Sequence, residues 1–147
     1  MKTKKVLLII PLLFLIIGMG GCEDEMKKLF FENFTLNEEF CQWRQFEVDT
    51  VIIVNTKTEL GRITICTENL PEIDFDDYSL VFAGGTAIHG VGIIVRHLYE
   101  VSNNSLILEL KDRNSGSIVP TVETPWAVAV LSQKLPQNTN IELRIKK

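Results

Sequence analysis

The sequence predicts an α+β domain built mainly from an antiparallel β-sheet, as a sandwich or an open barrel, with one short helix after the first strand. Three observations favour this class. Runs of β-branched and alternating apolar residues recur along the chain from residue 46 onward. Most of these runs are joined by short turns, which is typical of antiparallel neighbours. One segment, beginning at Thr56, carries the start signal of a helix.

The first predicted strand covers residues 46–54, where Val and Ile are concentrated. A capping box follows, because Thr56 and Glu59 have the spacing at which the Thr56 hydroxyl accepts a hydrogen bond from the Glu59 backbone N–H and the Glu59 carboxylate reaches back. This signal predicts a short helix over residues 57–65. Pro71 cannot continue a helix, so the chain is expected to leave the helical conformation before it.

Alternating or continuous apolar segments predict the remaining strands. They cover residues 79–83, 91–101, 106–111, 126–131 and 141–146. Between them, residues 84–90 are expected to form a glycine-rich loop, residues 103–104 a tight hairpin turn and residues 112–124 a long polar loop. Consecutive strands with short connections imply an antiparallel sheet, and the single helix is expected to cover one of its faces.

The N-terminus has the order of a secretory signal peptide. A basic start is followed by an apolar run over residues 6–17 and then by small residues. This run is shorter than the roughly 20 residues that a membrane-spanning helix needs. Residues 19–22, Met-Gly-Gly-Cys, resemble the lipobox of bacterial lipoproteins, which implies cleavage before Cys22 and lipidation of its thiol. The alternative is a chance cysteine after an ordinary signal peptide.

These features divide the chain into three parts. Residues 1–21 are expected to be the lipoprotein signal peptide, residues 22–45 an N-terminal tether and packing segment, and residues 46–147 a single α+β domain. The acidic residues 23–25 resemble the surface-export signal of Bacteroidetes lipoproteins. That resemblance implies an outer membrane lipoprotein displayed on the cell surface, with the periplasmic face of the membrane as the alternative.

Charge bounds the partners of the mature chain. The full sequence has 15 basic and 19 acidic residues, and residues 1–21 hold three of the lysines and no acid. The mature chain therefore keeps 12 basic residues and has a net charge of about −7. Nucleic acid is not an expected partner, because phosphate binding requires a basic surface. The expected partners are the membrane, through the lipid anchor, and another envelope protein or a glycan.

Two cysteines remain once Cys22 is assigned to the lipid. Outside the cytoplasm an even pair favours a disulfide, here between Cys41 and Cys66. The bridge would close a loop of about 25 residues and tie the N-terminal segment to the domain. The alternative is two buried free thiols, which are also common in protein cores.

The glycine-rich loop is the first candidate for a binding site. It contains Gly84, Gly85, His89 and Gly90, and Arg113 adds a cation from the long polar loop. Loops on a rigid sheet commonly carry binding groups, and glycines let a partner approach the backbone closely. A phosphate-binding loop is not expected, since a β-branched strand follows where such a loop needs a helix start. The alternative is that both loops are solvated connectors.

No catalytic residue, cofactor or metal site is predicted. His89 and His97 are too far apart on an extended strand to share a metal, and parity places His97 on the apolar face of its strand. The aspartates of the turn at 74–77 resemble the start of a calcium loop but lack its glycine and bidentate glutamate, so turn formation explains them better. The alternative function is a small hydrolase that uses His89 near the Asp74–Asp77 turn.

Several short motifs carry resemblances to known families. Asp-Thr-Val at 49–51 resembles the acceptor of Bacteroidetes protein O-glycosylation. Other motifs are Leu-Pro-Glu-Ile-Asp-Phe at 70–75, Tyr-Ser-Leu-Val at 78–81, the glycine loop, Thr-Pro-Trp at 124–126 and Gln-Lys-Leu-Pro at 133–136. With these motifs, residues 70–147 resemble small Bacteroidales lipoproteins and the C-terminal domain of PrcB-type protease-complex subunits. His-Gly-Val-Gly at 89–92 replaces the Thr-Gly-Gly-Tyr of that domain. The resemblance implies a non-enzymatic accessory or binding lipoprotein.

Changing Cys22 to Ala tests the predicted anchor. Without the thiol that receives the lipid, the protein is expected to accumulate as uncleaved precursor or to leave the membrane fraction. Mass spectrometry of the N-terminal peptide from the parent protein provides the direct measurement. An unmodified mature N-terminus at Cys22 would contradict the prediction.

Overall fold

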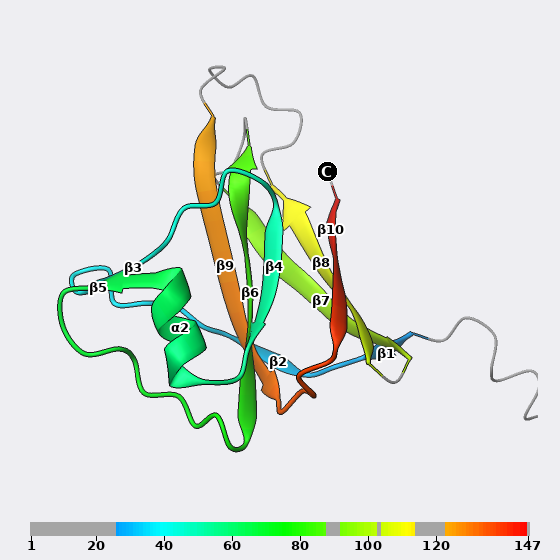
Figure 1. Ribbon diagram of the computed structural model, residues 1–147. Helices are drawn as coiled ribbons and strands as arrows, with labels where there is room; N and C mark the ends of the chain where they lie inside the picture. Colours follow the sequence, from blue (N-terminus) through cyan, green and yellow to red (C-terminus); the bar gives the residue numbers. More distant parts are fainter. Residues whose placement is uncertain (1–25, 88–91, 103, 114–122, 147) are drawn as a thin grey trace, which may run out of the picture.

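Two four-stranded β-sheets pack face to face, and a helix with a small two-stranded sheet lies on the outer side of one of them (Figure 1). The computed structural model describes residues 26–87, 92–102, 104–113 and 123–146. In chain order, the elements are β1 (Lys27–Lys28), β2 (Phe31–Asn33), β3 (Cys41–Trp43), β4 (Thr50–Val54), α2 (Lys57–Ile63), β5 (Thr64–Cys66), β6 (Tyr78–Ala87), β7 (Ile93–Ser102), β8 (Ser105–Asp112), β9 (Thr124–Gln133) and β10 (Asn140–Lys146).

The two large sheets have different strand orders. Sheet A has the order β1-β7-β8-β10, sheet B has the order β2-β9-β6-β4, and β3 with β5 forms the small sheet. All neighbours are antiparallel except β8 and β10, which run parallel because the chain between them passes through β9 in sheet B. The predicted α+β fold, mainly antiparallel and with one short helix, is confirmed, and it takes the form of a sandwich.

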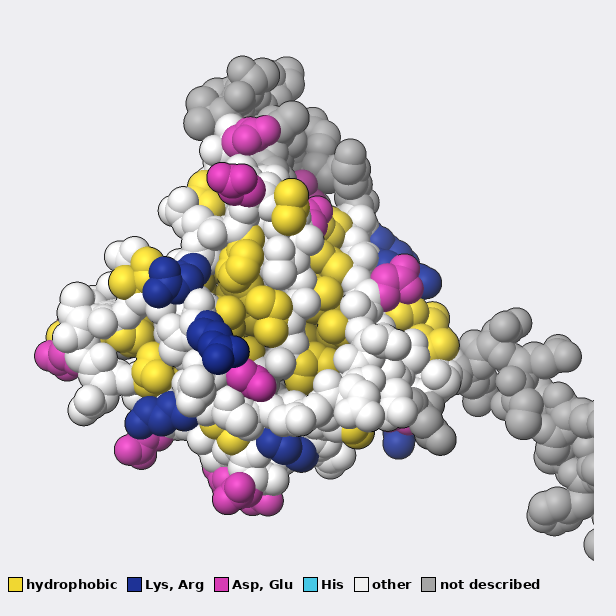
Figure 2. Space-filling view, viewed as in Figure 1, with side chains coloured by type: hydrophobic (Ala, Val, Ile, Leu, Met, Phe, Trp, Pro, Cys, Tyr) yellow, Lys and Arg dark blue, Asp and Glu magenta, His cyan; other side chains and the backbone are white. Residues whose placement is uncertain are grey.

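The main core lies between sheets A and B, where strand alternation directs every second side chain. Its buried members are Val81, Ala83, Ile93, Leu98, Leu106, Leu108, Leu110, Trp126, Val130 and Leu135. Half-buried side chains of the edge strands β4 and β10 pack against this core. Hydrophobic side chains remain visible over these two strands in Figure 2.

Sheet B is buried on both faces. In β6, Ser79–Ala83 are all fully buried, with Val81 in the main core and Phe82 on the opposite face. That opposite face is a second core with the buried members Val54, Leu60, Ile63, Leu80, Phe82 and Ala129. A strand covered on both faces is expected to be continuously apolar, and this explains the sequence of β6.

The predicted capping box starts α2. The Glu59 backbone N–H donates to the Thr56 hydroxyl at 3.1 Å, and the Asn55 N–H donates to the Glu59 carboxylate at 2.6 Å. The predicted end at residue 65 was wrong, because the helix stops at Ile63. The next three residues, Thr64–Cys66, instead pair with β3 and continue as a strand.

The N-terminal segment is more structured than predicted. It contributes β1 to sheet A, β2 to sheet B and β3 to the small sheet. The single helix therefore follows the fourth strand and not the first, which corrects the predicted element order. Strands of two or three residues are too short to show a periodicity in the sequence, and their pairing depends on contacts with distant strands.

Strand β7 carries a bulge that reverses its predicted parity. The register with β8 shifts between Val95 and His97, so that Arg96 is an extra residue. Leu98, not His97, is then fully buried in the main core. The His97 ring is half-buried and lies 5.3 Å from the ring of Tyr99. The expectation that His97 lies on the apolar face was therefore wrong.

The predicted disulfide between Cys41 and Cys66 is present. The two residues are direct partners in the antiparallel β3–β5 pair. Trp43, two residues after the bridge, packs against Phe82 with ring centroids 5.0 Å apart. The disulfide therefore holds an aromatic part of the N-terminal segment on the outer face of sheet B.

Replacing both Cys41 and Cys66 with Ser tests this role. The bridge spans 25 residues, and its loss is expected to lower the free energy of unfolding by about 3 kcal/mol through the entropy of the unfolded chain. Urea denaturation under non-reducing conditions measures the change. A variant as stable as the parent would show that the bridge does not stabilise the fold.

Candidate functional site

A groove of about 840 Å³ lies between residues 33–45 of the N-terminal segment and the first residues of β7 and β9. Its aromatic and aliphatic lining includes Phe34, Trp43, Ile93, Ile94, Val95, Trp126 and Val128. Polar side chains from the N-terminal segment complete the rim, among them Asn33, Glu38, Gln42 and Gln45. The groove is thus an apolar surface with a few polar groups, the usual character of a ligand-binding site.

An open strand edge forms one side of the groove. β2 pairs with β9 only at Val130–Ser132, and the last bond of this ladder runs from the Phe34 N–H to the Ala129 carbonyl at 2.9 Å. After Phe34 the chain turns away toward β3. Within the described residues, β9 therefore has a strand neighbour only on its β6 side from Pro125 to Val128.

The hydrogen bonds between β2 and β9 show which way the backbone N–H and C=O groups of β9 point along this edge. In an antiparallel strand, the N–H and C=O of every second residue point to the same side. Since Ala129 bonds toward β2, Ala127 also points its N–H and C=O toward the groove, while Val128 bonds toward β6. Pro125 occupies the next edge position and has no N–H, which is where a proline is tolerated in a sheet.

Two tryptophans, Trp43 and Trp126, line the groove. Trp43 contacts the ring of Phe34 edge-on at 6.2 Å and remains half-buried. Trp126 is almost completely buried, and its indole Nε1 has no hydrogen-bond partner. The Nε1 atom lies against Gly85 of the neighbouring strand β6, 3.2 Å from the position that a Cβ on that glycine would take, so this donor is enclosed within the fold.

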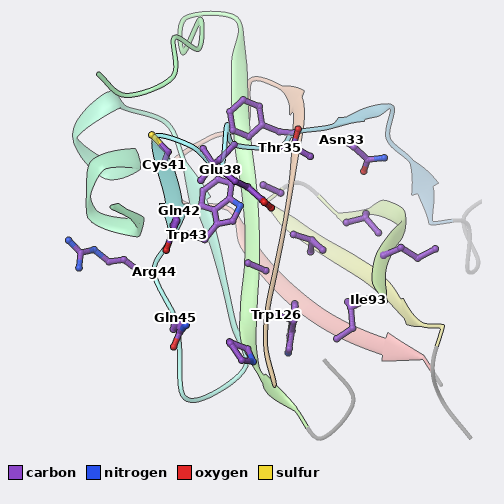
Figure 3. A pocket seen from close by; sticks show the side chains of 18 residues that line it. Asn33, Thr35, Glu38, Cys41, Gln42, Trp43, Arg44, Gln45, Ile93 and Trp126 are labelled. Carbon is purple, nitrogen blue, oxygen red and sulfur yellow. The ribbon is translucent and has the colours of Figure 1, made fainter. Parts of the chain in front are cut away.

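The charged side chains of the groove differ in direction. Figure 3 shows Glu38 and Trp43 pointing toward the middle of the cavity, whereas Arg44 points away from it. A carboxylate and an indole ring at the same cavity favour a cation, which is attracted by both.

The structure corrects the boundary of the glycine-rich loop. Gly84 and Gly85 belong to strand β6, where they are buried and pair with Ala127 and Trp126. They have no free surface on which to bind a ligand. His89 and Gly90 lie outside the described residues. Close packing around Gly84 and Gly85 explains why both positions are glycine.

Arg113 and the aspartate turn are separate from the groove. Arg113 is exposed after the end of β8, where its backbone N–H donates to the Gly92 carbonyl at 3.2 Å. The turn is closed by the Asp74 side chain, which accepts from the Asp76 N–H at 3.1 Å. The ten residues of β6, about 33 Å of strand, separate the turn from Ala87, the last described residue before His89.

Two further expectations concern a metal and a modified threonine. Among the described residues there is no group of three His, Cys, Asp or Glu side chains that could hold a metal ion. Thr50 of the Asp-Thr-Val motif is half-buried at the start of β4, and its hydroxyl donates to the Val48 carbonyl at 2.9 Å. Glycosylation of Thr50 stays a prediction.

No protein-family model matches the chain, and no curated protein or solved structure is significantly similar to it. The resemblance to PrcB-type domains therefore stays a prediction based on short motifs. In the described part of the chain, no helix has the length and apolar character needed to cross a membrane.

Sequence reasoning did not assign the groove. Its residues come from the N-terminal segment, which was predicted to be a tether that packs on the domain, and from strands far away in the sequence. One signal was present: residues 29–43 contain five aromatic side chains, more than a solvated tether needs. Only the fold shows that two of them, Phe34 and Trp43, line the same groove as Trp126.

Substituting Gly84 with Ala tests the packing role that replaces the predicted loop role. A Cβ on Gly84 would lie 2.8 Å from Phe82 Cζ and 3.2 Å from the Trp126 carbonyl oxygen. Since Phe82 is fully buried, the substitution is expected to lower the free energy of unfolding by about 1–3 kcal/mol.

The matched control is Gly61→Ala in α2. A Cβ there would meet only Leu70 Cδ1, at an ordinary 3.5 Å. Alanine favours the helix more than glycine does, so this variant is expected to be more stable by about 0.4–1 kcal/mol. Thermal or urea denaturation of both variants measures the difference. If Gly84→Ala were as stable as the parent, close packing would not explain the glycine.

Proposed function

We propose that this protein is a non-enzymatic, lipid-anchored binding lipoprotein of the bacterial outer membrane. In this proposal it binds an extended peptide segment of another envelope protein in the groove. The observation that supports it most strongly is the open edge of β9 beside an aromatic surface. We place the protein at the cell surface, with the periplasmic face as the alternative, on the basis of the acidic residues 23–25.

Strand addition is the binding mode that an open edge favours. An unpaired edge presents N–H and C=O groups that an extended peptide can satisfy with its own backbone. The added strand would continue the line of β2 along β9 and bond to Ala127. Because Pro125 lacks an N–H, the edge offers only a few such bonds, and the apolar contacts must supply much of the affinity.

The side chains of the groove define the peptide that fits. Phe34 and Trp43 favour apolar residues, and the Glu38 carboxylate beside Trp43 favours a Lys or Arg between them. The net charge of about −7 for the mature chain favours a basic partner as well. A peptide with one basic residue flanked by apolar residues is therefore the expected ligand.

Panning a phage-displayed library of short linear peptides on the immobilised protein tests the proposal. We expect enriched peptides to carry a Lys or Arg next to apolar residues. Glu38→Gln is expected to weaken their binding about two- to fivefold, since an ion pair at an exposed site contributes up to about 1 kcal/mol. Glu39→Gln is the matched control, because the adjacent Glu39 is exposed and does not line the groove.

The same peptides distinguish strand addition from simple apolar binding. Only every second residue of an added strand points its N–H toward β9. N-methylation of these amides is therefore expected to abolish binding, whereas N-methylation of the intervening amides is expected to leave binding intact. Equal effects of both sets would contradict strand addition. If no peptide is enriched but a glycan array shows binding that Trp43→Ala removes, the groove binds carbohydrate and the peptide proposal is wrong.

A further inference from the structure

A second surface, at the end of the domain where the N-terminal tether begins, exposes large hydrophobic side chains. Met26, Phe30 and Val101 are 42%, 78% and 48% exposed. β1 pairs with β7 so that Lys27 faces Glu100, and continuing this register places Met26 opposite Val101. We call Met26, Lys27, Lys28, Phe30 and Val101 the tether patch.

The exposure of Phe30 follows from the local backbone. Its neighbours Leu29 and Phe31 both pack against the main core, so alternation directs Phe30 away from it. Phe30 has the largest exposed fraction among the exposed large hydrophobic residues of the described chain. Water is a poor environment for a phenyl ring, and an exposed apolar group of this kind commonly marks a surface that contacts a partner or a membrane.

The length of the tether decides which partner covers this patch. Only three residues, Glu23–Glu25, separate the lipidated Cys22 from Met26. Four steps of fully extended chain span at most about 14 Å. A lipid on Cys22 therefore holds the tether patch within about that distance of the bilayer surface. This step rests on the lipid anchor of the proposed function.

We propose that the tether patch docks on the lipid bilayer beside the anchor. Met26, Phe30 and Val101 enter the interfacial region, as the apolar side chains of peripheral membrane proteins do, and Lys27 and Lys28 reach the lipid phosphates. The acidic residues 23–25 offset the two lysines, so apolar contact carries the docking and added salt has little effect on it.

Docking would orient the groove. Val101 and Ile94 lie on the same strand, seven residues or about 23 Å apart. With Val101 at the bilayer, the groove wall formed by Ile93–Val95 is held away from the lipid. The anchor and the tether patch together would present the groove to a partner beyond the membrane surface.

The test uses tryptophan fluorescence of the full-length lipidated protein in vesicles of equimolar phosphatidylethanolamine and phosphatidylglycerol. The variants are Phe30→Trp and Val48→Trp, measured with and without brominated acyl chains, which quench indoles that enter the bilayer. Val48 is the matched control because it is 72% exposed. The parent protein contains two tryptophans, both in the groove, and its fluorescence is subtracted as the background.

The two positions lie at opposite ends of sheet B. Phe31, next to Phe30, pairs with Ser132 of β9, whereas Thr50, close to Val48, pairs with Gly84 and through it aligns with Ala127. Five residues of β9, about 17 Å, separate these levels. One docked orientation can therefore bring the first position, and not the second, into the lipid.

We expect brominated lipid to remove most of the added fluorescence in Phe30→Trp and none in Val48→Trp. Flotation of the vesicles in the same samples shows whether the protein is attached to the membrane, independently of the quenching. If the protein floats with the vesicles but neither variant is quenched, or both are quenched equally, docking through the tether patch is wrong while the anchor stands. If the protein does not float, the lipid anchor is wrong and the docking proposal is overturned with it.

Discussion

Phe82 lies in the middle of sheet B without exposed surface, and the rings of Trp43 and Phe46 pack against it at centroid distances of 5.0 and 5.5 Å. This contact connects the N-terminal segment to the outer face of a sheet whose inner face is already filled by the main core. An uncovered outer face would expose Phe82 and Leu80 to water, which is unfavourable for each buried large side chain. The covering segment is therefore part of the fold.

The path of that segment also determines where the groove lies. The chain leaves β9 after Phe34 to reach the disulfide and Trp43, and this departure leaves the edge of β9 open from Pro125 to Val128. The same departure places the aromatic side chains beside the open edge. One requirement, covering Phe82, thus produces both the apolar wall and the unpaired backbone from which we infer peptide binding.

The buried polar groups near the ends of β4 and β6 form one hydrogen-bonded network. The Ser79 hydroxyl donates to the Asn55 side chain and accepts from the Leu135 N–H, at 2.8 Å, so these buried groups are satisfied within the fold. Lys134 closes the network through the carbonyls of Asn55 and Phe75. Trp126 Nε1 has no such partner. The Nε1 atom is enclosed beside Gly85 of β6, so it belongs to the interior as the Ser79 network does.

Local signals predicted the long elements and the helix start, because a capping box and strand alternation depend on neighbouring residues. The short strands β1 to β3 and the bulge at Arg96 depend on distant partners, so the sequence showed neither them nor the parity change at His97. The groove was missed for the same reason. Gly84 and Gly85 were predicted to bind because glycine suits loops, but here glycine is required by close packing in a strand.

The open edge of β9 is the central claim, and residue-resolved amide hydrogen exchange of the free protein tests it most directly. Val128, which pairs with Ala83 in β6, has its N–H in the ladder, whereas the Ala127 N–H points into the groove. We predict that the Ala127 amide exchanges far faster than the Val128 amide, although the two are adjacent in one strand. Equal, strong protection of both amides would mean that the edge is already covered, and it would contradict the account.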